Sequence, residues 1–261
     1  MTTAETDDDA GSTRVLLRTP SFPRLRRLWA ETRSKSILRA LEYERLHGLG
    51  LSGRVLDFGG GKRINYAGRI AAWADPAAGF DYESANIDAA TDPTYLLAPD
   101  ADLPCEDGRY DAVLALNTLE HVYGLSATLR RLHRVLRPGG ELIVTVPFLF
   151  PVHGHPDDYT RGTPSFWHRV LAEHGFGEVV VEALTWGPFS TAATVVGTPG
   201  PLKRLRVGWA LLLDLAYHAA RSGLGVTLTE RQDAPLCRGP FGYFIRCARV
   251  AGPVPAAPGE G

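Results

Sequence analysis

Residues 54–61 read RVLDFGGG, and this stretch decides the fold of the 261-residue chain. A short apolar strand runs into three consecutive glycines. In an open parallel sheet, ligands bind beyond the carboxyl ends of the strands. Glycines at that point allow the backbone to pass close to a ligand. The stretch therefore predicts the first core strand and, after it, a ligand-binding turn.

The segments that follow alternate between strand and helix patterns. Leu125, Leu129, Leu132 and Leu136 share one helical face, and the RPGG sequence after them is typical of a helix stop. A second helix is predicted from Pro164 to a stop at Gly175. Strands are predicted at residues 84–88, 94–97, 110–116, 141–147, 177–184 and 241–250. This alternation predicts an α/β fold with a mostly parallel sheet and helices on both faces.

The remaining segments frame this core. Residues 1–20 are acidic and small at their start, and residues 251–261 are rich in Pro and Gly, so both are predicted as disordered tails. Residues 21–50 carry apolar positions at helical spacing and predict an N-terminal helical lid of one or two helices. The core is predicted over residues 51–184, a helical insertion or lid over residues 185–240, and the final core strand over residues 241–250.

Composition excludes several classes of protein. The formal net charge of −1 gives no basic surplus for nucleic acid. The three cysteines form no CxxC pair, so a disulfide framework or a thiolate zinc site is not expected, and a cytoplasmic setting fits. The most apolar segment, residues 207–220, is too short for a membrane span and contains Asp214. A core or dimer helix, a lid over a lipophilic acceptor, and contact with a membrane surface stay open for this segment.

The residues around the glycines discriminate between ligand classes. A P-loop has Gly at the position of Leu56 and Ser or Thr at the position of Arg63, so this is not a P-loop. A dinucleotide fingerprint has Gly or Ala at the position of Ile64, which argues against a dinucleotide. The sequence reads D-x-G-x-G instead, with Asp57 at the strand end. A carboxylate there suits a cationic amino group, and Asp88 after the second strand suits ribose hydroxyls. A ligand with ribose, an ammonium group and no phosphate is S-adenosyl-L-methionine.

The ordered motifs VLDFGGG, NID, DADLP, NTLEH and LRPGGELIVTVPF resemble those of class I S-adenosylmethionine-dependent methyltransferases of the type 11 kind. The resemblance covers roughly residues 54–176 and implies a Rossmann-like sheet whose last strand is antiparallel. It also implies the cofactor contacts. The methionine part would be framed by Asp57, Gly59, Gly60 and Gly61, and the ribose would be held by Asp88. The adenine would contact Asp100 and Ala101, with Asp102 as the alternative to Asp100. The region near the sulfonium would be lined by Asn117 to His121.

Residues 146–164, VPFLFPVHGHPDDYTRGTP, follow the fifth strand, where an acceptor would approach the methyl group. HGHPDD is similar to the zinc signature of metallo-β-lactamase-type hydrolases, but the parallel α/β context argues against a metal, and none is expected. A similar loop occurs in type 11 methyltransferases linked to glycans or small metabolites. His153 is the first candidate for a general base, His155 the second and His121 the third, because histidine titrates near neutrality.

Two further loop residues are assigned to the acceptor, and a structural alternative stays open. Tyr159 and Arg161 would orient the acceptor, and Arg161 would favour an acid or phosphate on it. Alternatively, Arg161 and Asp158 hold the shape of the loop, and Thr163 with Pro164 begins a helix.

The sequence therefore predicts an enzyme, a methyltransferase acting on oxygen of a small metabolite or sugar-containing molecule, as in natural-product biosynthesis. The alternatives are a non-methyl reaction such as cyclisation on the same scaffold, and a non-catalytic cofactor-binding partner protein.

Overall fold

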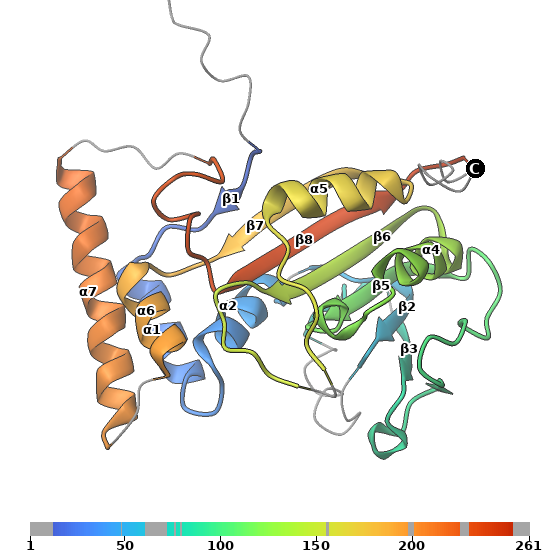
Figure 1. The fold of residues 1–261 in the computed structure, drawn as a ribbon, viewed down its shortest axis with the longest axis horizontal. Helices are drawn as coiled ribbons and strands as arrows, with labels where there is room; N and C mark the ends of the chain where they lie inside the picture. Colours follow the sequence, from blue (N-terminus) through green and yellow to red (C-terminus); the bar gives the residue numbers. More distant parts are fainter. Residues whose placement is uncertain are drawn as a thin grey trace, which may run out of the picture.

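The computed structural model describes residues 13–47, 49–60, 72–75, 77–78, 80–154, 157–197, 201–224 and 230–252. Its centre is an eight-stranded sheet with the order β1-β7-β8-β6-β5-β2-β3-β4 (Figure 1). The strands are β1 Leu16–Leu17, β2 Gly53–Phe58, β3 Phe80–Asn86, β4 Tyr95–Leu96, β5 Tyr110–Leu116, β6 Leu136–Pro147, β7 Phe176–Leu184 and β8 Gly242–Arg249. Strand β8 runs antiparallel to β6 and β7, and the other pairings are parallel. The predicted fold class is confirmed.

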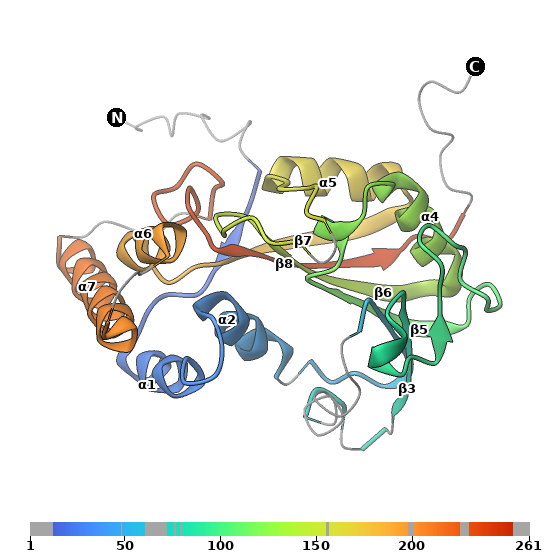
Figure 2. The ribbon, with the colours of Figure 1, turned by 60° about the horizontal axis from the view of Figure 1, so that its bottom comes forward.

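Helices cover both faces of the sheet (Figure 2). Helices α4 (Leu125–Val135) and α5 (Pro164–Glu173) lie on one face, where Leu129, Leu132 and Trp167 are fully buried against the strands. Helix α2 (Ile37–Leu46) covers the other face, and its apolar side belongs to a second core cluster. Short 3-10 turns at Ala89–Thr91 and Leu119–His121 follow β3 and β5.

Polar caps explain where the helices begin. The hydroxyl of Ser36 accepts the backbone N–H of Arg39 at 3.1 Å, so a new helix starts there and the predicted N-terminal region is split in two. The first part is α1 (Phe22–Glu31), capped by Ser21. Thr163 accepts the N–H of Phe166 at 3.4 Å with a proline at the first position, so its predicted capping role is confirmed.

Several boundaries differ from the sequence-based expectations. The predicted N-terminal tail is too long, because β1 pairs with β7 and Val15 is fully buried. Leu136 and the RPGG stretch begin β6 rather than end a helix, since α4 already stops at Val135. Helix α6 (Pro188–Val196) was not predicted. The expectations for residues 1–12 and 253–261 lie outside the described residues.

The insertion before β8 is helical, as predicted. Helix α6 packs beside α7 (Lys203–Gly223), with α1 nearby (Figure 1). Asp214 of α7 is fully buried and accepts the N–H groups of Phe189 and Ser190, both at 2.9 Å. This carboxylate caps α6 and joins the two helices. Within the described ranges, none of the helices combines the length and apolarity that a membrane crossing requires.

Candidate active site

The glycine turn follows β2 and packs tightly against the end of β5. Gly59 has φ +81°, and a Cβ added there would lie 2.3 Å from the side chain of Thr118. A Cβ at Gly60 would lie 2.7 Å from an Oδ atom of Asp57. Only glycine fits these two positions without a local shift. Gly61 lies outside the described residues.

Asp57, the residue before the last of β2, carries a buried carboxyl group. The hydroxyl of Tyr82, a residue that the sequence did not single out, donates to its Oδ2 at 2.8 Å. Burial raises the pKa of Asp57 to about 6, against the opposing effect of that hydrogen bond. The carboxyl group is therefore mostly ionised at neutral pH and suits a cationic amine.

The predicted ribose residue lies one step further along the same edge. Asp88 is exposed after β3 and accepts the N–H of Ala90 at 2.9 Å. Asn86, at the end of β3, donates through Nδ2 to the backbone oxygen of Gly60 at 2.7 Å. The strand end that carries Asp88 is thereby attached to the glycine turn. An exposed carboxylate in this position remains available to ribose hydroxyls.

The structure separates the two acids proposed for the adenine. Asp102 accepts from Arg134 at 3.1 Å and from the N–H of Leu103 at 2.9 Å, which is a loop-capping role. Asp100 is exposed, has φ +59°, and is followed by the half-buried Ala101. We keep Asp100 and Ala101 as the predicted adenine contacts.

These residues fit S-adenosyl-L-methionine. The turn leaves no room for side chains at Gly59 and Gly60, so its backbone can approach a ligand closely. The buried acid at Asp57 matches the ammonium group of the methionine part, and the exposed acid at Asp88 matches a ribose.

Asn117 connects the end of β5 to the N-terminal helices. Its φ is +50°, and its Nδ2 donates to Oε2 of Glu42 at 2.7 Å. Glu42 is a fully buried residue of α2, and burial raises its pKa. The side chain of Asn117 is thus engaged with α2, whose apolar side packs against the sheet. The roles of Asn117 as a cofactor contact and of the N-terminal helices as a lid stay predictions.

Two of the predicted histidines meet at the carboxyl end of the sheet. The rings of His121, after β5, and His153, in the loop after β6, lie 5.1 Å apart between centroids and nearly perpendicular. Nδ1 of His121 lies 2.5 Å from the backbone oxygen of Asp157. The ring of Phe150 lies 5.6 Å from that of His153. His155, the second candidate base, lies outside the described residues.

Asp158 holds His153 in place. Its buried Oδ2 accepts the backbone N–H of His153 at 3.1 Å and lies 3.4 Å from the Nδ1 of the same residue. Burial alone would raise the pKa of Asp158, but hydrogen bonds from Arg161 and from the His153 backbone outweigh it and hold that pKa below its ordinary value. Asp158 is therefore an ionised group beside the imidazole, while Nδ1 of His153 has the backbone oxygen of Pro151, 3.2 Å away, as its hydrogen-bond partner.

The other two predicted acceptor residues are engaged within the loop. Both terminal nitrogens of Arg161 donate to Asp158, the arrangement expected if this pair shapes the loop. Tyr159 is about half exposed, and its hydroxyl donates to Asp157 at 3.0 Å. Its backbone N–H donates to the oxygen of Glu120 at 2.7 Å, which ties the loop to the end of β5. A role for either side chain in orienting an acceptor stays a prediction.

Glu120 stands inside the NTLEH motif, to which the sequence analysis gave a place near the sulfonium, but its carboxyl group was assigned no role of its own. It is fully buried, and neither carboxyl oxygen has a hydrogen-bond partner among the described residues. Burial raises its pKa to about 8. Together with His121 and His153 it offers donor atoms that all lie within 4.8 Å of one another, an arrangement that could hold a cation. The sequence analysis expected no metal, and the motif gave no signal for this carboxyl group beyond its position.

We expect Glu120→Gln to remove a pH dependence of stability. As the pH rises from about 4.5 to about 8, the unfolded chain loses the Glu120 proton before the folded protein does. The free energy of unfolding should therefore fall over this range relative to that of Glu120→Gln, by on the order of a few kcal/mol. Urea denaturation of chelator-treated protein at pH 5 and pH 8 checks this. The exposed control Glu106→Gln should track the wild type, and a Glu120→Gln difference that is the same at both pH values would contradict the expectation.

Comparison with known proteins identifies the family of the chain. A family model described as a methyltransferase domain matches residues 24–182. A sarcosine/dimethylglycine N-methyltransferase of Halorhodospira halochloris is 33% identical over 90 residues, covering 31% of this chain and 32% of that protein. The match thus spans about a third of the length of this curated relative.

Two solved structures share the fold. One is a methyltransferase in complex with the Trm112 methyltransferase activator of Haloferax volcanii, with a TM-score of 0.52, 14% identity, and coverage of 86% of this chain and 94% of that chain. The other is an S-adenosylmethionine-dependent methyltransferase from Archaeoglobus fulgidus, with a TM-score of 0.50, 14% identity, and coverage of 80% and 94%.

The fold and the family match are those of a class I S-adenosylmethionine-dependent methyltransferase domain, for which the residues after β2 and β3 fit S-adenosyl-L-methionine as cofactor. The match over residues 24–182 places the chain in the methyltransferase domain family, to which it belongs.

Proposed function

We propose that this chain transfers the methyl group of S-adenosyl-L-methionine to an oxygen atom of a small metabolite or sugar-containing acceptor, with His153 as general base. The observation that carries the proposal is the placement of His153 beside His121, with its Nδ1 at 3.2 Å from the backbone oxygen of Pro151 and 3.4 Å from the ionised Asp158. A histidine whose Nδ1 is engaged within its own loop presents Nε2 to a substrate proton.

The chemistry requires little else of the protein. S-adenosyl-L-methionine, when bound, supplies a methyl group already activated on a sulfonium. The chain must align the acceptor and remove its proton. Nε2 of His153 would take that proton, and the carboxylate of Asp158 would stabilise the imidazolium formed. Asp57 and the glycine turn would hold the methionine part, away from this proton transfer.

An amine acceptor is the second candidate. The matched segment of a relative named as an N-methyltransferase supports it. The same base serves either acceptor, because an amine and a hydroxyl both lose a proton on methylation. A cytoplasmic biosynthetic role, a homodimer and membrane-surface contact stay predictions.

Cofactor titration followed by product analysis tests the proposal. We expect saturable binding of S-adenosyl-L-methionine in calorimetry. Incubation of the full chain with methyl-deuterated cofactor and a pool of hydroxylated metabolites, sugars and amines should give products that retain the labelled methyl group in mass spectrometry. Altered products without the label would favour cyclisation or another non-methyl reaction. Absence of cofactor binding would contradict the proposal outright.

A further inference from the structure

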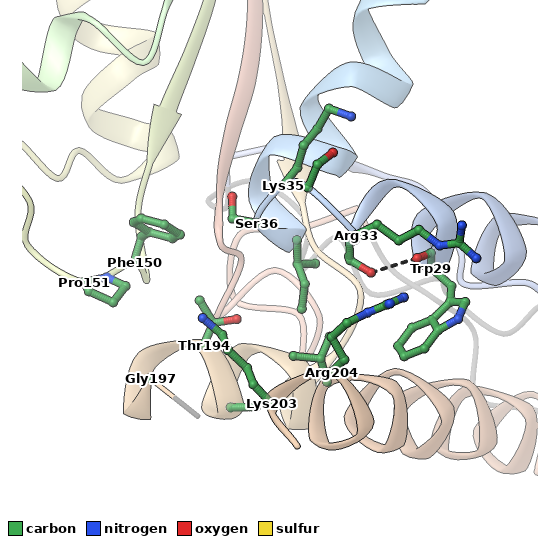
Figure 3. A pocket seen from close by; sticks show the side chains of 15 residues that line it. Trp29, Arg33, Lys35, Ser36, Phe150, Pro151, Thr194, Gly197, Lys203 and Arg204 are labelled. Carbon is green, nitrogen blue, oxygen red and sulfur yellow. Dashed lines mark hydrogen bonds between the residues drawn. The ribbon is translucent and has the colours of Figure 1, made fainter. Parts of the chain in front are cut away.

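A cavity of about 560 Å³ lies between the α1–α2 connection, the loop after β6, and helices α6 and α7 (Figure 3). This volume is in the range of small-molecule sites. The described residues that line it include the cations Arg33, Lys35, Lys203 and Arg204, and none of them is acidic. Such a lining selects an anion.

The cations differ in how they are engaged. Lys35 forms an ion pair with Glu31, and its ammonium lies over the ring of Tyr43. The guanidinium of Arg204 lies 5.1 Å from the ring centroid of Trp29, a stacking contact that leaves its N–H groups free to donate. For Arg33, Lys203 and Arg204, no acidic partner occurs in the part of the chain that the structure describes.

The beginning of α7 adds to this positive potential. The helix starts at Lys203 with no side-chain cap and no acid in its first turn. Cations at a helix N-terminus face the positive end of the helix dipole, which is unfavourable unless an anion binds there. Figure 3 shows Arg204 extending from this turn toward the wall that carries Arg33, and Lys203 extending toward Thr194 of α6. Opposite walls of the cavity thus contribute unbalanced charge.

The cavity also adjoins the proposed base. Phe150 and Pro151 form the side of the cavity that belongs to the loop after β6. The ring of Phe150 lies 5.6 Å from the ring of His153. A molecule that extends through the cavity as far as Phe150 would therefore lie close to the imidazole.

We propose that this cavity binds a phosphate group of the acceptor, so that the substrate is an organic phosphate; this inference rests on the proposed function. A phosphate dianion balances more of the charge on Arg33, Lys203 and Arg204 than a monocarboxylate does. The arginine forks match its oxygens, and hydroxyl groups of Ser34, Ser36 and Thr194 supply further donors from the lining.

Binding of phenyl phosphate to the full chain, measured by calorimetry, tests the inference. We expect phenyl phosphate to bind more tightly than benzoate, and phenol not to bind. Lys203→Glu, Arg204→Glu and, from the opposite wall, Arg33→Glu should each weaken phenyl phosphate binding by at least about tenfold. The conservative Arg204→Lys should retain part of the affinity. Uridine diphosphate and dodecyl phosphate, as further probes, distinguish nucleotide from lipid sources of the phosphate.

The matched control is Arg26→Glu, which makes the same charge change at an exposed position of α1 outside the cavity lining and should bind phenyl phosphate as the wild type does. Unchanged affinity in the three cavity variants, no binding in the wild type, or equal binding of benzoate would overturn the inference. Cofactor affinity, measured in parallel, should be equal in all variants. Phosphate binding by a chain that does not bind S-adenosyl-L-methionine would contradict the proposed function and leave the phosphate site standing.

Discussion

Replacement of His153 by alanine should lower turnover by roughly 10²–10⁴-fold, the range for a lost general base. The cofactor affinity should not change, because the imidazole contacts Pro151 and Asp158 in the loop after β6 while the glycine turn follows β2. Steady-state kinetics with the acceptor found by product analysis, together with cofactor calorimetry, measure both quantities.

The control for His153→Ala is His47→Ala, which removes an exposed imidazole at the end of α2 and should leave turnover unchanged. Unaltered turnover in His153→Ala would remove this residue from the mechanism. If His121→Ala then lowered turnover, the general base would be His121, the other ring of the pair.

Gly59→Ala should weaken binding of S-adenosyl-L-methionine by at least about tenfold, equivalent to about 1.4 kcal/mol. The added Cβ would lie 2.3 Å from Thr118 while φ stays at +81°, so the turn must shift away from the end of β5. Overpacking of this kind also costs about 1–3 kcal/mol of stability. Calorimetry with the cofactor and urea denaturation report the two effects separately.

Gly139→Ala is the matched control for the turn. Gly139 has φ +75°, close to that of Gly59, but a Cβ there meets nothing within 4 Å. Gly139→Ala therefore introduces the backbone strain of a positive φ without a steric clash. We expect it to lower the stability by about 1 kcal/mol with no change in cofactor affinity. If the two variants bound the cofactor equally well, the close approach at Gly59 would have no role in forming the site.

The parallel core could be predicted because its signals are local. Strand β5 has the bounds expected from its apolar run, and Thr163 caps α5 as its place before a proline indicates. Strand β1 could not be found in this way, since Leu16–Leu17 is a two-residue strand whose partner, β7, lies far along the chain. Helix α6 starts with Pro188, but the residue before it has no side chain that could cap the helix, because the capping carboxylate comes from Asp214 of another helix.

In the site, too, features with a local sequence signal could be predicted, and features that depend on distant contacts could not. The carboxyl ends of β2 and β3 carry Asp57 and Asp88 in the expected order. The contact between His121 and His153 depends on the path of the loop after β6. Hydrogen bonds to the carboxylate of Asp158, such as that from the backbone N–H of His153, stabilise this path. The burial of Glu120 depends on how that loop covers the end of β5. Neither feature has a periodic pattern in the sequence.

The position of β8 has a consequence for synthesis on the ribosome. Strands β6 and β7 do not pair with each other, and β8 fills the space between them, with Leu142 opposite Cys247 in register. Until Gly242 and the residues after it have been translated, the sheet consists of two ribbons, each with an open hydrogen-bonding edge. The nascent chain must therefore keep both edges from pairing with other chains while α6 and α7, which follow β7, are still being made.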